Sequence, residues 1–336
     1  MNDILGNSDE NASPMSKHNE LGEVNKLHQL VAQISSALIG QKNVIEQVVL
    51  ALMANGHVLL EGVPGLGKTL LVRALAKTFS GDFRRIQFTP DLMPSDITGH
   101  VVYDMNQKTF QMSPGPVFTN LLLADEINRA PAKSQAALLE VMQERQVTTE
   151  NKSRAVPQPF MVLATQNPIE QEGTYPLPEA ELDRFLIKVV IDFPEQSDEI
   201  ALTKLVTQNQ VGDNNSINNI QAVLSADELL AYQQRIASIE VDEEVVAYAV
   251  RIVRATRNYP AIYRGAGSRA AIALVRIAKA KAFYEGRNFV LPDDVKTLAL
   301  PVLQHRIALT PDVEIEGMRA EDVISTLLND IEAPGR

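Results

Sequence analysis

Residues 62–69 read Gly-Val-Pro-Gly-Leu-Gly-Lys-Thr, a glycine-rich turn that ends in a lysine and a hydroxyl side chain. The spacing G-x-x-x-x-G-K-[ST] is typical of a phosphate-binding loop, because its glycines let successive backbone N–H groups turn toward one phosphate. A strand is expected before the loop and a helix after it, so the positive end of the helix dipole also faces the phosphate. We therefore expect a nucleotide site formed by Gly62, Val63, Pro64, Gly65, Leu66, Gly67, Lys68, Thr69 and Leu70.

Two side chains of this loop carry the chemistry. Lys68 is expected to reach the β- and γ-phosphates, and the Thr69 hydroxyl is expected to bind Mg²⁺. The alternative is a glycine-rich turn that only packs. The order of strand, loop and helix favours the phosphate site.

A pair of carboxylates, Asp125 and Glu126, follows the apolar residues 121–124. Side chains at the carboxyl end of a buried parallel strand lie at the ligand crevice of an α/β sheet. Asp125 is predicted to hold Mg²⁺ through water, and Glu126 is predicted to activate the attacking water as a general base. A solvated acidic pair or a helix cap is the alternative interpretation, which the phosphate loop disfavours.

A neutral amide follows the next apolar stretch, because residues 160–164 lead into Thr165-Gln166-Asn167-Pro168. Asn167 could donate and accept hydrogen bonds beside the carboxylates without adding negative charge. Asn before Pro is also common in simple turns, so its position after a buried strand is what favours a role. The five histidines form no ligand-spaced cluster and cysteine is absent, so Mg²⁺ is the only metal expected.

The elements around these residues alternate between strand and helix. Strands are expected at residues 57–60, 85–88, 121–124, 160–164 and 185–191, with helices at 70–79 and 133–145 between them. This alternation predicts an α/β fold, a mostly parallel sheet with helices on both faces. Polar insertions at about 91–119 and 146–159 interrupt it, the first with two extended pieces and the second resembling a hairpin.

The expected domain organisation has three parts. Residues 1–20 are polar and predict a mobile tail, residues 21–194 form the α/β nucleotide-binding core, and residues 195–336 form a helical lid domain. Within the core, Gly40 separates two helices. Helices of the lid are expected at residues 195–208, 226–238, 242–256, 268–284 and 292–304.

Composition narrows the function classes. The 336 residues have a net charge of −11 and are 45% hydrophobic. An acidic surface repels phosphate backbones, so a nucleic-acid partner is not expected. The start of the chain has no basic and apolar leader, and the apolar run at residues 48–54 is too short to span a membrane. We therefore expect a cytoplasmic protein without membrane insertion.

Five segments together resemble the MoxR family of AAA+ ATPases, a group within the P-loop NTPases. They are GVPGLGKT, LLLADEINRAP, ATQNP, EAELDRF at 179–185 and GAGSRA at 265–270. Their order and spacing are also similar to those of the magnesium-chelatase ATPase subunit. The resemblance extends from about residue 38 to the carboxyl end, and both insertions correspond to inserts of that wider group.

The resemblance implies roles for further residues. Asn167 matches the sensor 1 residue, and Arg184 matches the arginine finger, which acts on the nucleotide of a neighbouring subunit. Arg269 matches sensor 2, which would touch the γ-phosphate from the lid, with ATP between core and lid. The stretch around Ile39 and Gly40 resembles the segment that lines the adenine pocket.

Alternatives for the arginines stay open. Arg184 could instead form a surface ion pair with Asp183 or Glu181, and Arg269 could be a solvated helix residue. Arg129, just after the two carboxylates, is a further candidate for an arginine that acts on a neighbour.

The resemblance also implies an activity and partners. The cofactors would be ATP and Mg²⁺, the reaction would be hydrolysis of ATP to ADP and phosphate, and the assembly would be a hexameric ring. Its work would be the chaperone-like remodelling or activation of partner proteins, or metal insertion into them, with a partner that carries a von Willebrand factor A domain. Three rivals are a nucleotide-gated scaffold with little turnover, a nucleic-acid-dependent motor and a true magnesium-chelatase subunit.

Overall fold

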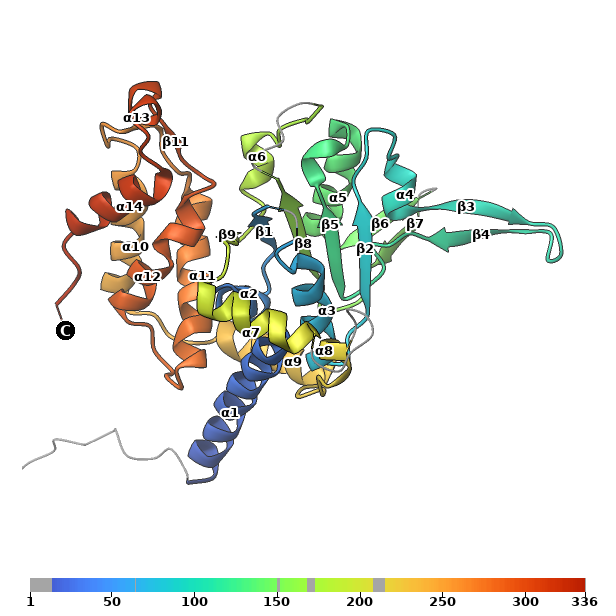
Figure 1. Ribbon diagram of the computed structural model, residues 1–336, viewed down its shortest axis with the longest axis horizontal. Coiled ribbons are helices and arrows are strands. Elements are labelled where there is room, and N and C mark those ends of the chain that lie inside the picture. Colours follow the sequence, from blue (N-terminus) through green and yellow to red (C-terminus); the bar gives the residue numbers. More distant parts are fainter. Residues whose placement is uncertain (1–13, 64, 150–151, 168–172, 208–214, 336) are drawn as a thin grey trace, which may run out of the picture.

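A parallel sheet of 5 strands in the order β2-β5-β8-β1-β9 forms the centre of the chain (Figure 1). The computed structural model describes residues 14–63, 65–149, 152–167, 173–207 and 215–335. The strands are β1 (Val58–Glu61), β2 (Phe83–Gln87), β5 (Leu121–Asp125), β8 (Met161–Gln166) and β9 (Ile187–Val190). All four pairings are parallel, and Val58 of β1 lies between Leu163 of β8 and Ile187 of β9. The predicted parallel-sheet core is confirmed.

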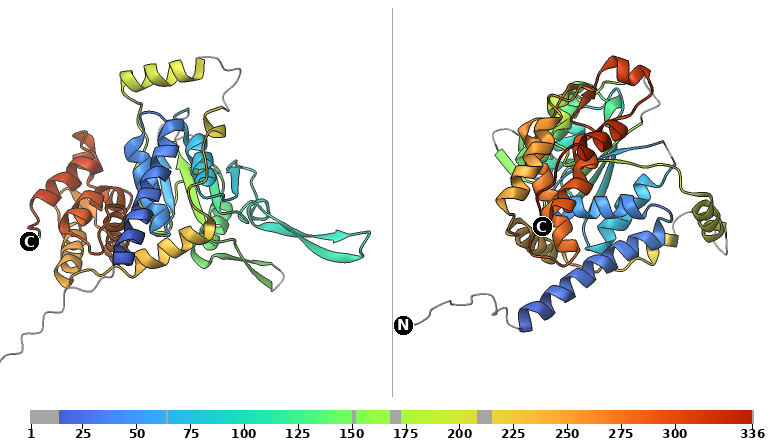
Figure 2. Two further views of the ribbon diagram at one scale, coloured as in Figure 1. Left: turned by 90° about the horizontal axis from the view of Figure 1, so that it is seen from below. Right: turned by 90° about the vertical axis from the view of Figure 1, so that its left-hand side faces the viewer.

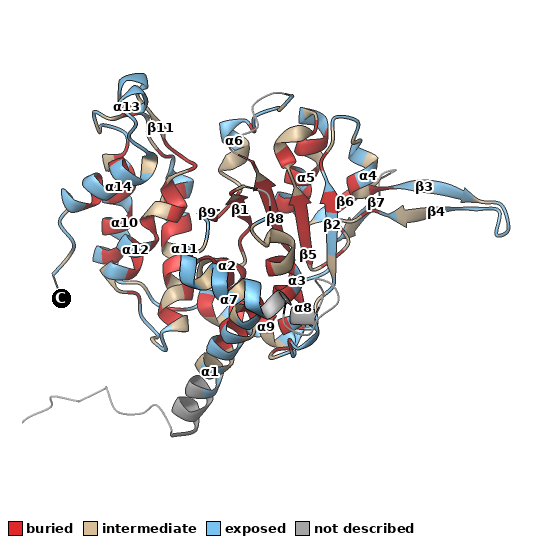
Figure 3. Cartoon of the chain, viewed as in Figure 1, coloured by how far each residue is buried: buried red, intermediate tan, exposed pale blue. Residues whose placement is uncertain are grey.

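Alternate residues of each strand enter two different cores. Leu60, Leu123 and Leu163 pack with α2 (Lys42–Met53) and α3 (Lys68–Thr78), and α1 (Pro14–Ala37) packs on α3. Their neighbours Leu59 and Leu122 pack with α5 (Ala132–Glu144) on the opposite face. Figure 3 shows the resulting red layer of buried residues along the sheet. Burial on both faces explains why these strands are continuous apolar runs.

Both insertions contain antiparallel hairpins. The first carries α4 (Pro94–Thr98) and a hairpin of β3 (Gly99–Asp104) and β4 (Thr109–Pro114), and the second consists of β6 (Gln146–Thr149) and β7 (Lys152–Ala155). The β3–β4 hairpin extends away from the body of the molecule in Figures 1 and 2. A short 3₁₀ helix, η1 (Ile127–Arg129), connects β5 to α5.

The second half of the chain is mainly helical. Its elements are α6 (Glu179–Leu182), α7 (Gln196–Thr207), α8 (Asn215–Asn218), α9 (Ala226–Ala237), α10 (Glu243–Ala255), β10 (Ile262–Arg264), α11 (Ser268–Tyr284), α12 (Pro292–Leu303), β11 (Ala308–Leu309), α13 (Pro311–Ile315) and α14 (Ala320–Asn329). The helices α10, α11, α12 and α14 pack on one another as the lid. Figure 2 shows α7 standing off the body. The two-stranded pair β10–β11 and the helix α14 lie outside the elements expected from the sequence.

Two expectations about domain boundaries need correction. The helix α1 begins at Pro14, so the predicted tail is wrong for residues 14–20, while residues 1–13 lie outside the described residues. Part of the region assigned to the lid packs on the core instead: Gln233 of α9 donates to the Leu52 carbonyl at 2.7 Å, and the Val223 amide donates to the Thr78 carbonyl at 2.7 Å.

Candidate functional site

The phosphate loop connects β1 to α3, as the sequence predicts. Gly65 and Gly67 have φ values of +91° and +80°, in the left-handed region that favours glycine. A Cβ at Gly62 would lie 2.6 Å from the Ile191 carbonyl oxygen, so this position has no room for a side chain. Pro64 lies outside the described residues. The backbone therefore forms the close turn that a phosphate-binding loop needs.

Lys68 is the first residue of α3, and Thr69 is the second. The Lys68 Nζ donates to the Gly62 carbonyl. Burial lowers the pKa of Lys68, whereas the nearby carboxylates of Asp125, Glu126 and Glu61 act to raise it. A half-buried ammonium at a helix N-terminus fits the charge of a triphosphate.

The Asp125 carboxylate is held by two partners. The Thr165 hydroxyl donates to Oδ1 at 2.6 Å, and Arg85 donates to Oδ2 from Nη2 at 2.5 Å and from Nε at 3.1 Å. Thr165 also accepts a hydrogen bond from the Glu126 amide at 2.8 Å. One buried hydroxyl on β8 therefore orients both residues of the acidic pair.

Glu126 has a strained backbone and a restrained carboxylate. Its φ is +56°, a left-handed conformation that is uncommon outside glycine. Its Oε2 accepts a hydrogen bond from the Gln87 side-chain amide at 2.6 Å and lies 3.2 Å from the Arg129 Nε. Non-glycine residues in such conformations often lie at functional sites, where the surrounding contacts support the strain.

The remaining predicted residues converge on the same edge of the sheet. Because β8 lies between β5 and β1, Asn167 follows a strand whose carboxyl end lies between the acidic pair and the phosphate loop. Asn167 is buried. The segment with Ile39 and Gly40 is also close, because a Cβ at Gly67 would lie 2.6 Å from Leu38 Cδ1. Leu70 packs against the core that contains α3.

Arg184 and Arg269 lie together, but they are far from the phosphate loop of their own chain. Both line a pocket of about 310 Å³ with Asn55, Gly56 and His57, which come before β1, whereas Gly62 comes after it. The 4 residues of β1, at about 3.3 Å each, separate the pocket residue His57 from Gly62 of the phosphate loop by about 13 Å. The expectation that Arg269 meets ATP between the core and lid of one chain is therefore not met in this structure.

The lid is fastened at this amino-terminal end of the sheet. The buried Arg306 pairs with Asp183 at 2.7 Å and donates to the Phe185 carbonyl at 2.6 Å. Asp183 thus pairs with Arg306 and not with Arg184. Burial raises the pKa of Glu181 while the nearby Arg184 acts to lower it, so the Glu181 part of the alternative stays open. Arg269 is exposed at the start of α11. Arg129, the further candidate for an arginine that acts on a neighbour, instead lies beside Glu126 of its own chain in this structure.

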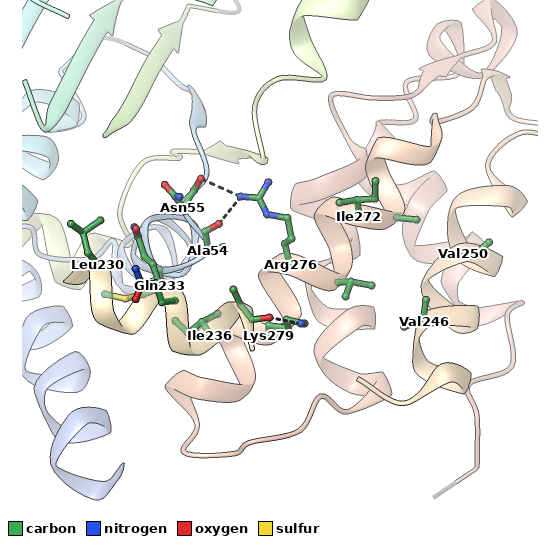
Figure 4. A pocket seen from close by; sticks show the side chains of 15 residues that line it. Ala54, Asn55, Leu230, Gln233, Ile236, Val246, Val250, Ile272, Arg276 and Lys279 are labelled. Atoms are coloured by element: carbon green, nitrogen blue, oxygen red, sulfur yellow. Dashed lines mark hydrogen bonds between the residues drawn. The ribbon is translucent and has the colours of Figure 1, made fainter. Parts of the chain in front are cut away.

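An apolar groove of about 710 Å³ adjoins the arginine pocket (Figure 4). It lies between the carboxyl end of α2 and the helices α9, α10 and α11, and the two cavities share Asn55, Ile272 and Arg276. Arg276 spans them, with Nη2 donating to the Ala54 carbonyl at 2.7 Å. The groove is therefore separate from the phosphate loop.

Three polar residues of the site escaped the sequence reasoning: Thr165, Arg85 and Gln87. Arg85 and Gln87 alternate on β2 directly beside the strand of the acidic pair, and the Arg85 Nη2 also donates to Gln87 Oε1 at 2.9 Å. Polar residues at alternate positions near the carboxyl end of a strand were the available signal.

The residues present fit a magnesium–nucleotide complex. The described residues contain no group of three or more His, Cys, Asp and Glu side chains that could hold a metal by themselves. Mg²⁺ typically takes one or two protein ligands together with substrate phosphates, which suits Thr69 and Asp125 beside the phosphate loop. No helix in the described part of the chain has the length and hydrophobicity of a bilayer span.

Comparisons with known proteins agree with this geometry. Residues 57–187 match the "ATPase family associated with various cellular activities (AAA)", and residues 254–327 match the "AAA lid domain". Chaperone MoxR1 of Mycobacterium tuberculosis is 42% identical over 93% of this chain and 83% of its own length. Protein MoxR of Methylorubrum extorquens is 32% identical over 90% of this chain and 93% of its own. A crystal structure of a proposed ATPase from Cytophaga hutchinsonii has a TM-score of 0.87 at 41% identity and covers 96% of this chain and 98% of its own. The chain belongs to the MoxR family of AAA+ ATPases.

Proposed function

We propose that the chain hydrolyses ATP at interfaces between copies of itself in a closed ring, and that the resulting conformational change remodels partner proteins. In each interface one copy supplies Lys68, Asp125 and Glu126, and its neighbour supplies Arg184 and Arg269. A head-to-tail contact that closes on itself generates such a ring, and the family resemblance favours six subunits.

The observation that supports this proposal is the separation of the two charged groups. The arginine pocket lies before β1 and the phosphate loop lies after it, so one chain presents the two groups at opposite ends of its sheet. Arginines that act on a γ-phosphoryl group must contact it. In the proposed ring, the neighbouring copy supplies them.

Each residue of the nucleotide site has a separate role in the proposed reaction. The Lys68 ammonium binds the phosphate oxygens, and the Glu126 carboxylate accepts a proton from the attacking water once it leaves Gln87 and Arg129. Asn167 positions that water and the terminal phosphate. Thr69 and Asp125 would hold Mg²⁺, which would neutralise charge on the phosphates. An arginine supplied by a neighbour contributes about 10³–10⁵ in rate elsewhere, which makes turnover conditional on assembly.

The proposed work is chaperone-like. The relative named Chaperone MoxR1 supports this role, and the family resemblance extends it to activation of clients, to metal insertion, and to a partner with a von Willebrand factor A domain. These partners would be captured by the Glu126→Gln variant with ATP bound and identified by mass spectrometry.

Mixing two inactive variants tests the shared site. Lys68→Ala chains cannot hold the triphosphate, and Arg184→Ala chains cannot complete a neighbour's site. In mixed oligomers, some interfaces combine an intact Lys68 with an intact Arg184, so phosphate release should return. Absence of release in mixtures that assemble normally would contradict an arginine that acts between copies.

A further inference from the structure

We propose that Gln143 is a positioning residue, which orients Arg184 toward the nucleotide of the neighbouring copy. This inference rests on the proposed function, because it assumes that Arg184 acts between copies. Gln143 lies on α5 and is exposed at the surface, far from the phosphate loop of its own chain.

The Arg184 guanidinium is held along the last turns of α5. Its Nη1 donates to the Gln143 Oε1 at 2.7 Å and to the Leu139 carbonyl at 2.9 Å. The two acceptors are four residues apart and therefore neighbours on one helix face. The negative end of the helix dipole also favours a cation at this position.

The orientation of the Gln143 amide is fixed from its other side. Its Nε2 donates to the Glu144 Oε1 at 3.1 Å, so Oε1 is the atom that faces Arg184. The contact uses the two N–H donors of Nη1 and leaves the two of Nη2 for a phosphate. The Arg184 Nε is buried and has no hydrogen-bond partner among the described residues.

A neutral amide suits this task better than a carboxylate. The amide oxygen accepts the hydrogen bond without cancelling the positive charge that Arg184 must present to a phosphate. A carboxylate at residue 143 would keep an acceptor but compete with the phosphate for the arginine. Both Gln143→Ala and Gln143→Glu should therefore weaken the arginine, for different reasons.

The decisive experiment places the same substitution on either side of one interface. The starting mixture contains Lys68→Ala chains, which can supply only the arginine, and Arg184→Ala chains, which can supply only the nucleotide site. Gln143→Ala is then added to one type of chain at a time, and phosphate release is measured at saturating ATP in oligomers checked by light scattering.

We expect an asymmetric result. On the Lys68→Ala chain the substitution should lower the restored rate about tenfold, the effect of losing one hydrogen bond to a charged group. On the Arg184→Ala chain it should change the rate less than about twofold, because the residue it positions is absent. Glu140→Ala, which removes another exposed side chain from α5, is the matched control on both chains.

The possible outcomes separate the two proposals. Equal losses on both chains, or no loss on either, would overturn the role of Gln143 while leaving Arg184 as the shared arginine. If the starting mixture itself releases no phosphate, the shared site fails, and the inference fails with it. A general loss of stability cannot imitate the asymmetry, since both doubly substituted chains carry the same change on α5.

Discussion

Removing the Gln87 side chain should accelerate ATP hydrolysis. In this structure the Glu126 Oε2 receives the Gln87 amide at 2.6 Å and lies 3.2 Å from the Arg129 Nε. A carboxylate oxygen that already accepts from two donors has less lone-pair capacity left to accept the proton of a water. Gln87→Ala removes the shorter of the two contacts and leaves Arg129 in place.

The expected increase in turnover follows from the strength of the hydrogen bond between Gln87 and Glu126. A hydrogen bond to a charged group contributes about 1.5–3 kcal/mol, and the exposed position of Gln87 favours the lower value. About 1.4 kcal/mol corresponds to a tenfold change in an equilibrium. If Glu126 must leave Gln87 before it activates water, turnover should therefore rise by up to about tenfold, with little change in the affinity for ATP.

The assay is steady-state phosphate release as a function of ATP concentration, on oligomers of matched size. Arg84→Ala, one strand position before Arg85 and also exposed, controls for loss of a polar side chain from β2. The double variant Gln87→Ala, Glu126→Gln should be as slow as Glu126→Gln alone. A turnover that is unchanged or lower in assembled Gln87→Ala would refute the reasoning, because Gln87 would then support the active position of Glu126.

Three further changes test other parts of the site. Glu126→Gln should lower turnover by about 10²–10⁴ while ATP binding persists, as measured by phosphate release and by a fluorescent nucleotide. Unchanged turnover in the assembled variant would contradict Glu126 as the general base. Gly62→Ala should abolish tight ATP binding and destabilise the fold by about 1–3 kcal/mol, because its Cβ would lie 2.6 Å from the Ile191 carbonyl, whereas Gly335→Ala meets nothing within 4 Å and should be neutral in the same melting experiment. Burial lowers the pKa of His57 from 6.5 to about 4, so the unfolded chain binds the proton more tightly than the folded chain. The free energy of unfolding should therefore fall by about 3 kcal/mol as the pH decreases from about 6.5 to 4. His57→Gln should remove this part of the pH dependence of the melting temperature.

The half of the site on the phosphate side could be predicted because of a topological rule. Gly62, Asp125 and Asn167 each follow an apolar strand, and the carboxyl ends of parallel strands meet at one edge of the sheet. The contacts of Thr165 and Gln87 could not be predicted in the same way. They depend on which strands are neighbours, and the order β2-β5-β8-β1-β9 cannot be read from the chain order.

The position of Arg184 and Arg269 depends on packing that local patterns do not encode. Periodicity predicts that α11 is an amphipathic helix, but it does not tell which end of the sheet the helix meets. That choice is made by contacts far apart in sequence, such as Arg276 with the Ala54 carbonyl and Gln304 with the Lys188 carbonyl. The expectation of a lid that closes over its own nucleotide was wrong for this reason.

The same contacts argue against a lid that swings back to its own phosphate loop. Arg306 follows the last turn of α12, and it is buried against Asp183 and the Phe185 carbonyl, which flank Arg184 in sequence. Moving the lid to the carboxyl end of β1 would break this pair, and a buried Arg306 guanidinium left without its carboxylate is strongly disfavoured. It would also expose the core that α11 shares with α2. The attachment that keeps Arg269 away from its own nucleotide also keeps it beside Arg184, so a neighbouring copy would meet both arginines as one preassembled surface.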